Sequence, residues 1–219
     1  MRGIVALYLA ALALGATLTA SAAVAQRAAH IAVDLPPAGR RASEAPTIRS
    51  VGVLSDSRTR DLLNHGFPAR LHYRLELWSS GGWFNDVLRD IEWDVIVRLT
   101  PLDRRYVVAR IIGDRVTQLG SFDQFRDVET LLSAPFQPPM SPREDDTRMY
   151  YSAALDVEML SVNDLDEVER WLRGELRPAV RGRRNPGTAI TRGLRSLVVG
   201  LLGSENRHYE ARTRTFVPE

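Results

Sequence analysis

The chain has 219 residues, with 29 basic and 27 acidic side chains and a formal net charge of +2 at neutral pH. This near balance does not favour nucleic acid as a partner, and we expect none. The chain contains no cysteine, which excludes disulfide bonds, a thiolate nucleophile and cysteine-ligated zinc. All the basic residues are arginine, so chemistry that needs a lysine, such as a Walker A motif or a Schiff base, is excluded as well.

The first 25 residues have the three-part pattern of a secretory signal peptide. Arg2 precedes an apolar run from Ile4 to Leu18, and small residues follow up to Ala25. This pattern predicts export through the inner membrane and cleavage before Gln26, which places the mature chain in the periplasm or outside the cell. An uncleaved, membrane-associated anchor is the alternative, because the segment from Gly3 to Gln26 carries no charge and is long enough to cross a bilayer.

The mature chain begins with a segment of low periodicity. Residues 26–46 are rich in Ala, Pro and Arg and are predicted to form a flexible linker. A single β-rich domain is expected from 47 to 217. Its first elements are a strand at 48–54 and a short helix that begins at Asp56 or Ser57 and ends near Gly66.

The clearest alternation of apolar and polar residues covers Phe67–Trp78. It predicts a half-buried strand in an antiparallel sheet. The residues assigned to the buried face are Leu71, Tyr73, Leu75 and Leu77, and those assigned to the other face are Arg70, His72, Arg74 and Glu76.

Similar alternating or β-branched segments predict four further strands, at 93–99, 106–112, 116–119 and 149–160. Ser121 and Gln124 have the spacing of a capping box, which predicts a helix that begins there. The proline-rich segment 134–146 is expected to be a loop. Its acidic run Glu144-Asp145-Asp146 lacks the spacing of a calcium loop and is interpreted as solvated.

Two more helices are predicted near the C-terminus, from Asn163 to about Leu176 and from about Pro186 to Leu202, before a closing strand at Tyr209–Val217. Residues 163–203 would be a helical insertion or appendage. Short turns join most of the strands, which favours antiparallel pairing. The predicted fold is therefore mainly β or α+β: an antiparallel β-sandwich or roll of six to seven strands with three to four helices.

Four pieces of this pattern resemble one bacterial family. They are the secretion signal, the segment LSDSRTRDLLNHGFP from Leu54, the strand RLHYRLELW with the aromatic GGWF that follows, and WDVIVRLTPLDRRYVV from Trp93. Together they make residues 47–160 similar to the domain of unknown function 4390 family. The resemblance implies an exported envelope domain, and it supplies no catalytic residues.

No catalytic, cofactor or metal site is predicted from the sequence. The histidines show no metal-ligand spacing, and no G-x-S-x-G motif is present. Asp156 and Glu158 share one face of a predicted strand, and we expect them to pair with Arg212 and Arg214 if those strands are neighbours. The four histidines, interpreted as structural or solvated, are His30, His65, His72 and His208.

Two groups of residues are candidates for binding. The first is an aromatic cluster that could stack on a sugar or contact lipid, or could instead form an edge of the core. It consists of Trp78, Trp83, Phe84 and Trp93.

The second group is a basic segment with an adjacent apolar stripe. It could lie on an anionic membrane surface or contact a partner protein, or it could pack its apolar stripe on the sheet and leave its arginines solvated. Its arginines are Arg181, Arg183, Arg184, Arg192 and Arg195.

The sequence as a whole predicts an exported, non-enzymatic envelope domain that acts through contacts with an envelope protein or an anionic membrane surface. A sugar- or lipid-binding module centred on the aromatic cluster is the first alternative. A hydrolase whose Ser, His and Asp residues meet only on folding is the second.

Overall fold

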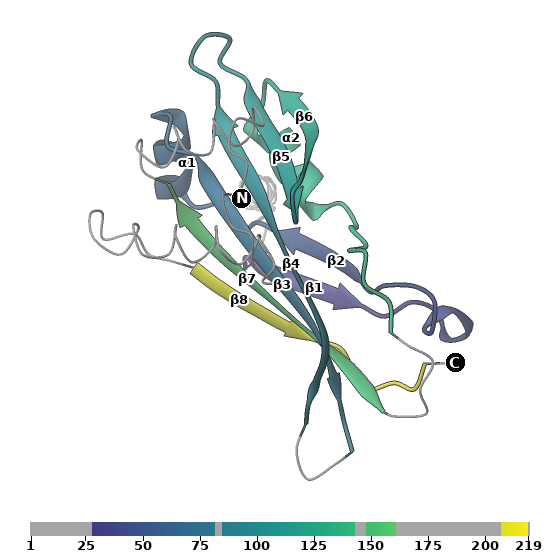
Figure 1. Ribbon diagram of the computed structural model, residues 1–219. Coiled ribbons are helices and arrows are strands. Elements are labelled where there is room, and N and C mark those ends of the chain that lie inside the picture. The colour runs from purple at the N-terminus through teal and green to yellow at the C-terminus, as the bar shows by residue number, and fades with distance from the viewer. Residues whose placement is uncertain (1–27, 82–84, 143–147, 161–206, 219) are drawn as a thin grey trace, which may run out of the picture.

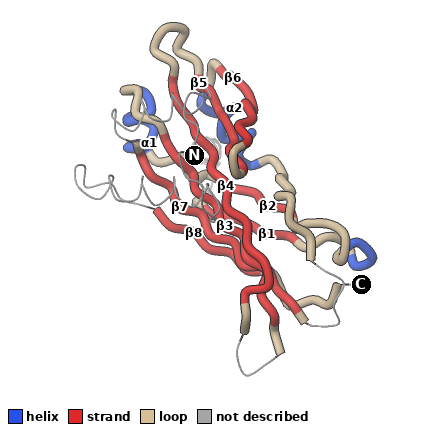
Figure 2. The backbone as a smooth tube through the Cα atoms, in the orientation of Figure 1, coloured by secondary structure: helices blue, strands red, loops and turns tan. Residues whose placement is uncertain are grey.

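The computed structural model describes residues 28–81, 85–142, 148–160 and 207–218, and this part of the chain is mainly antiparallel β-structure (Figure 1). Figure 2 shows the same chain by secondary structure, with strands in the majority. The elements in chain order are β1 (His30–Asp34), the short 3₁₀ helix η2 (Ala38–Arg40), β2 (Thr47–Val51), α1 (Ser57–Asn64), β3 (Ala69–Ser79), β4 (Val87–Leu99), β5 (Tyr106–Ile112), β6 (Arg115–Phe122), α2 (Phe125–Ser133), β7 (Met149–Met159) and β8 (Arg207–Arg212).

The strands form two sheets. The larger sheet has six strands in the order β6-β5-β4-β3-β7-β8, and the smaller consists of β1 and β2. Every neighbouring pair is antiparallel. Strands β3 and β4, of 11 and 13 residues, lie at the centre of the large sheet, and their hairpin extends beyond the rest of the sheet (Figure 1).

The core lies on one face of the large sheet, which we call the inner face. Alternation along β3 directs Leu71, Tyr73, Leu75 and Leu77 to this face, and the register places Leu71 and Tyr73 opposite buried residues of both neighbouring strands. Tyr73, for example, lies opposite Trp93 on β4 and opposite Leu155 on β7. All three side chains are at most 5 % exposed.

The smaller sheet and the two α-helices contribute side chains to this same core. Strand β1 contacts β7 and β8, whereas α2 contacts β2, β5 and β6. Ile48 of β2 also pairs with Phe136 through two backbone hydrogen bonds, which joins the small sheet to the segment that follows α2. Leu63 of α1 and Val128 of α2 are fully buried in this cluster.

The predicted mainly β, antiparallel class is confirmed, but several details differ from the expectation. The described residues form eight strands, whereas six or seven were predicted for the whole chain. Residues 26–46 were predicted as a linker, yet His30–Asp34 form β1, because Thr47–Val51 supply a partner strand that periodicity within 26–46 cannot reveal. Strand β4 begins at Val87 instead of residue 93.

The helices also differ in part from the prediction. Helix α1 is capped by Asp56, whose side chain accepts a hydrogen bond from the Thr59 backbone N–H. The predicted capping box is wrong: Ser121 belongs to β6, and α2 begins after Gln124 without a side-chain cap. Two α-helices are present among the described residues, and the two helices predicted within 163–203 lie outside them.

Within the described ranges, no helix combines the length and the apolar character needed to cross a membrane.

Candidate functional site

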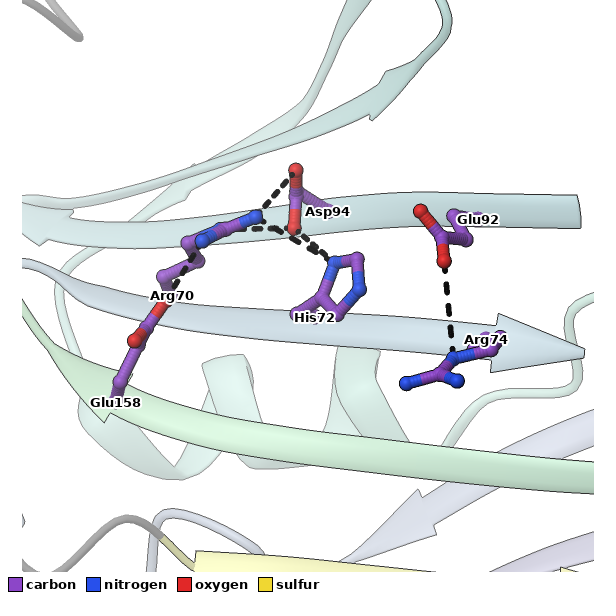
Figure 3. A network of polar contacts seen from close by, with 6 residues as sticks. All are labelled: Arg70, His72, Arg74, Glu92, Asp94 and Glu158. Carbon is purple, nitrogen blue, oxygen red and sulfur yellow. Dashed lines mark hydrogen bonds and ion pairs between the residues drawn. The ribbon is translucent and has the colours of Figure 1, made fainter. Parts of the chain in front are cut away.

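The outer face of the large sheet carries a network of charged side chains across its central strands (Figure 3). Arg70 of β3 is at its centre and is only 3 % exposed. Its Nε donates to Asp94 Oδ1 at 2.9 Å, and its Nη2 donates to Asp94 Oδ2 at 3.2 Å. On the other side, Nη1 donates to Glu158 Oε1 at 2.7 Å. One guanidinium therefore links β4, β3 and β7.

His72 joins the network through Asp94. Its Nδ1 lies 2.9 Å from Asp94 Oδ1. Because an ionised carboxylate only accepts hydrogen bonds, Nδ1 carries the hydrogen in this contact. The contact fixes the orientation of the imidazole ring, and it brings together two residues that lie 22 positions apart in the chain.

Two further groups extend the network across the outer face. Arg74 lies 3.7 Å from Glu92, the residue opposite it on β4 (Figure 3). Near the sheet edge, His208 of β8 has its Nδ1 2.7 Å from Asp156 and its Nε2 3.0 Å from Glu210. Both ring nitrogens face carboxylate oxygens, an arrangement that suits the doubly protonated, cationic imidazole.

These contacts change the ionisation of the groups involved. Burial alone would raise the pKa of Asp94, but the hydrogen bond from His72 and the charge of Arg70 outweigh it, and the pKa falls below its usual value. Burial disfavours the charged form of Arg70, but Asp94 and Glu158 together raise its pKa. For His208, the hydrogen bonds to Glu210 and Asp156 raise the pKa, although partial burial opposes this. The network therefore stabilises its own charged forms.

The catalytic chemistry available to this network is limited by the groups that contact its two histidines. An aspartate that orients an imidazole is half of a general-base arrangement, which also needs a hydroxyl or a water at the other ring nitrogen. Among the described residues, no Ser or Thr hydroxyl forms a hydrogen bond with His72 or His208. Nor does the described part of the chain hold a group of three side chains suited to a metal ion.

The strand-borne carboxylates do not pair as the sequence predicted. Strands β7 and β8 are neighbours, but the register places His208 opposite Asp156 and places Arg212 opposite Ser152. Glu158 instead contacts Arg70, on the strand to the other side. The predicted pairing with Arg212 and Arg214 is therefore wrong, because it depends on a register that alternation within one strand does not determine.

The predicted aromatic cluster does not form one surface. Trp78 lies on the outer face, where it stacks on Tyr150 with ring centroids 6.3 Å apart, and the guanidinium of Arg212 lies over the same tyrosine ring. Trp93 lies on the inner face, 3 % exposed, and stacks on Tyr73 at 5.0 Å. Alternation of side chains along paired strands separates the two. Trp83 and Phe84 lie outside the described residues.

The inner face holds a second feature, a small cavity between β2, the large sheet and α2. It measures about 30 Å³, and Trp93 and Arg110 are among the residues around it. Arg110 does not stand out in the sequence, because residues 106–112 form one nearly continuous apolar segment. The signal that could have found it is a charged residue at an inward position of a strand whose other inward residues are apolar.

The remaining predicted sites lie outside the part of the chain that the structure describes. The acidic run Glu144-Asp145-Asp146 lies outside the described residues. So do all five arginines of the predicted membrane or partner contact, Arg181, Arg183, Arg184, Arg192 and Arg195.

No protein-family model, no curated protein and no solved structure matches this chain. The resemblance to the domain of unknown function 4390 family therefore stays a prediction.

Proposed function

We propose that this protein is an exported envelope domain that works by binding another envelope component and catalyses no reaction. The observation that supports it most is the mutual pairing of Arg70, Asp94, His72 and Glu158 on the outer face. These side chains satisfy one another's hydrogen-bonding groups and charges, and the contacts join three strands. A rigid sheet of this kind is suited to presenting loops and edges to a partner.

The export part of the proposal rests on the leader. Arg2, the uncharged apolar run and the Ala23-Val24-Ala25 site form a complete signal-peptide pattern. Without residues 1–25 the chain has 28 basic and 27 acidic residues, since Arg2 is the one charge removed. Because the net charge of the mature chain is low, we expect local groups of charged residues, and not the overall electrostatic field of the protein, to select a partner.

A membrane surface is the partner class that the sequence supports best. The arginines from Arg181 to Arg195 precede an apolar stretch that ends at Leu202. Arginine near an anionic bilayer gains about 1 kcal/mol per residue, and apolar side chains add to the binding energy. An envelope protein with an acidic surface is the other partner that this segment fits.

A ligand-binding module is the second candidate function. On the outer face, Trp78, Tyr150 and Arg212 place two stacked rings and a cation together. Trp93 does not belong to this group, because it lies on the opposite face of the sheet, whereas Trp83 and Phe84 lie outside the described residues. Aromatic rings beside a polar face are suited to a sugar ring.

Fractionation of the native host, with mass spectrometry of the protein's N-terminus, tests the proposal. We expect a chain that starts at Gln26 in the periplasmic or membrane fraction. A cytosolic chain that still starts at Met1 would refute export. Labelling of the purified protein by a fluorophosphonate probe would refute the non-enzymatic part and support the hydrolase alternative, because that probe reacts with activated serines.

A further inference from the structure

The outer face of the large sheet is much less accessible to solvent at one end than along the rest of its length. Arg70 and Arg74 lie on this face of β3, between the same two neighbouring strands, and each is paired with carboxylates. The side chain of Arg70 is nevertheless 4 % exposed, whereas that of Arg74 is 38 % exposed. Neighbouring strands lie beside a side chain in the plane of the sheet and do not cover it from above. The difference therefore requires a cover over the Arg70 end of the face.

An apolar cluster lies at this same end. It consists of Ile96 of β4, Ile111 of β5 and Leu160, which directly follows β7, with Val116 of β6 packed against them. The first three residues are at most 8 % exposed. Among the described residues, the α-helices and the small sheet contribute to the inner core, and none of their residues belongs to the outer cluster. An apolar patch on a sheet is stabilised by a second layer of structure packed on it.

The chain leaves the described structure at this cluster and re-enters it close by. Leu160 is itself a member of the cluster, and its backbone N–H donates to the carbonyl of Pro68 at 2.8 Å. Arg207 begins β8, which pairs with the end of β7 that precedes Leu160. Residues 161–206 connect these two points in the sequence, so this segment is attached at the edge of the patch that needs a cover.

The first part of this segment has an apolar stripe of the required kind. The stripe predicts a helix over 163–176 with one apolar side and charged residues on the other. Its apolar residues recur at spacings of three and four: Leu165, Val168, Leu172 and Leu176.

The length of the predicted helix also fits the patch. From β7 the sheet order runs through β3 and β4 to β5, and three strand spacings amount to about 14 Å. A helix rises about 1.5 Å per residue, so about nine residues cover this distance. Counted from Asn163, a helix that crosses the strands from Leu160 brings Leu172 over Ile111.

We propose that residues 161–176 dock on the outer face as an amphipathic helix whose apolar stripe covers Ile96, Ile111 and Leu160. The helix adds a third layer to the fold and places the Arg70–Asp94 ion pair beneath it, in agreement with the low exposure of Arg70. The inference leaves the arginines from Arg181 to Arg195 to the proposed membrane contact and does not rest on it. Its tests can therefore fail while the proposed function stands, and the reverse is also true.

Thiol labelling of single-cysteine variants tests whether the face is covered, because the chain has no cysteine of its own. Ile111→Cys probes the apolar cluster, and Asp90→Cys probes the exposed part of the same face on β4. In the full chain, purified as the host makes it, we expect a maleimide to label Ile111→Cys at least tenfold more slowly than Asp90→Cys. Equal rates would overturn the proposal.

A triple replacement in the apolar stripe identifies the segment that forms the cover. It should increase the labelling rate of Ile111→Cys at least tenfold and leave that of Asp90→Cys unchanged. The replacements are Leu165→Asp, Val168→Asp and Leu172→Asp.

The matched control adds the same charge to the second apolar stretch of the segment. We expect it to leave both labelling rates unchanged. An equal effect of the two triple replacements, an effect of the control alone, or no effect of either would overturn the proposal, because another segment or a bound partner would then cover the face. The control replacements are Ile190→Asp, Leu194→Asp and Leu197→Asp.

Val108→Cys distinguishes loss of the cover from unfolding, because Val108 is fully buried on the inner face of the same strand as Ile111. We expect it to stay protected when the stripe carries the three aspartates.

If the stripe variant does not fold, a disulfide formed with the stripe otherwise intact provides an independent test. Ile111→Cys combined with Leu172→Cys should form an intramolecular disulfide under mild oxidation, since the bond needs Cα atoms within about 7 Å. Asp90→Cys combined with Leu172→Cys should not. A disulfide in both pairs or in neither, detected by mass spectrometry, would overturn the proposal.

Discussion

Arg70 and Asp94 form a two-point contact along a diagonal between neighbouring strands. The register pairs Arg70 with Ile96 and pairs His72 with Asp94, so Arg70 reaches two residues along β4 to bind both carboxylate oxygens of Asp94. Glu158 lies directly opposite Arg70 on β7 and binds the remaining Nη1. The ion pair is therefore part of the sheet itself, and its loss affects three strands at once.

Asp94→Asn is predicted to destabilise the fold strongly. Removal of one partner from a buried ion pair costs about 3–5 kcal/mol, because the other charge remains buried without compensation. Urea unfolding followed by circular dichroism measures the change. The control is Asp34→Asn, which breaks a pair between exposed side chains on the small sheet and should cost less than about 1 kcal/mol. Equal losses in the two variants would contradict the structural importance of the network.

The loss of stability caused by Asp94→Asn is also predicted to depend on pH. The pKa of Asp94 is lowered in the folded state, because His72 and Arg70 outweigh the effect of burial. A carboxyl of this kind contributes stability above its unfolded pKa of about 3.9, and the contribution is lost as the pH falls through the lower folded value. The difference in unfolding free energy between wild type and Asp94→Asn should therefore be constant near neutral pH and shrink below about pH 4. A difference that does not change down to pH 2 would contradict this.

His208→Gln is predicted to act in the opposite pH range. The pKa of His208 is raised by its hydrogen bonds to Glu210 and Asp156. A raised pKa gives stability that is fully present below the unfolded value of about 6.5 and lost as the pH rises through the folded value. The variant should thus lose stability at pH 5.5 and match wild type at pH 9.

The size of this effect is small, since the His208 side chain is 47 % exposed and an exposed pair contributes less than about 1 kcal/mol. Thermal unfolding at the two pH values measures it. His30→Gln is the control, because His30 Nδ1 contacts a backbone carbonyl instead of a carboxylate. A deficit that is larger at pH 9 than at pH 5.5 would rule out the assigned ion pairs.

The two tryptophans on opposite faces of the sheet should respond differently to truncation. Trp93→Ala removes a ring that is 3 % exposed and stacks on Tyr73, and a loss of about 3–5 kcal/mol is expected. Trp78→Ala removes a partly exposed ring that stacks on Tyr150, with a smaller loss of about 0.5–1.5 kcal/mol for the aromatic pair beyond its buried area. Chemical denaturation of both variants gives the comparison. Equal losses would show that Trp93 is not a core residue.

Binding to anionic vesicles tests the basic segment. We expect the protein to sediment with vesicles that contain phosphatidylglycerol and not with pure phosphatidylcholine, and we expect binding to weaken as salt increases. Replacement of the five arginines from Arg181 to Arg195 by glutamine should reduce binding at least tenfold. Replacement of Arg40, Arg41, Arg49, Arg58 and Arg60 is the control for charge. An equal reduction in the two variants would mean that overall charge, and not this segment, is responsible.

Several elements of the fold could be predicted because they depend on neighbouring residues. The alternation in β3 is complete within one strand, and the cap of α1 depends on Asp56 and Thr59, three residues apart. Strand β1 could not be found in this way. Its five residues gain their hydrogen bonds from β2, which follows after a gap of twelve residues.

The candidate sites depend almost entirely on pairing between strands. Alternation correctly assigned Arg70 and His72 to the face opposite the core, yet it could not show that Asp94 and Glu158 would enclose Arg70. The same limit led to the wrong partners for Asp156 and Glu158. A shift of one residue in register reverses the face of every side chain, and no local pattern selects among registers of the correct parity.

By itself, the sequence determined the exclusions and the local structure: no thiol or lysine chemistry, a leader pattern, and strands whose period of two separates apolar from charged residues. The tertiary structure alone decided which charges meet, that Trp78 and Trp93 face opposite ways, and that Arg110 lies on the inner face beside a small cavity. The physical reason is distance along the chain. The face to which a side chain points is set by its own strand. Its partners can lie far away in the sequence, as Glu158 lies 88 residues from Arg70, and they meet only once the sheet has formed.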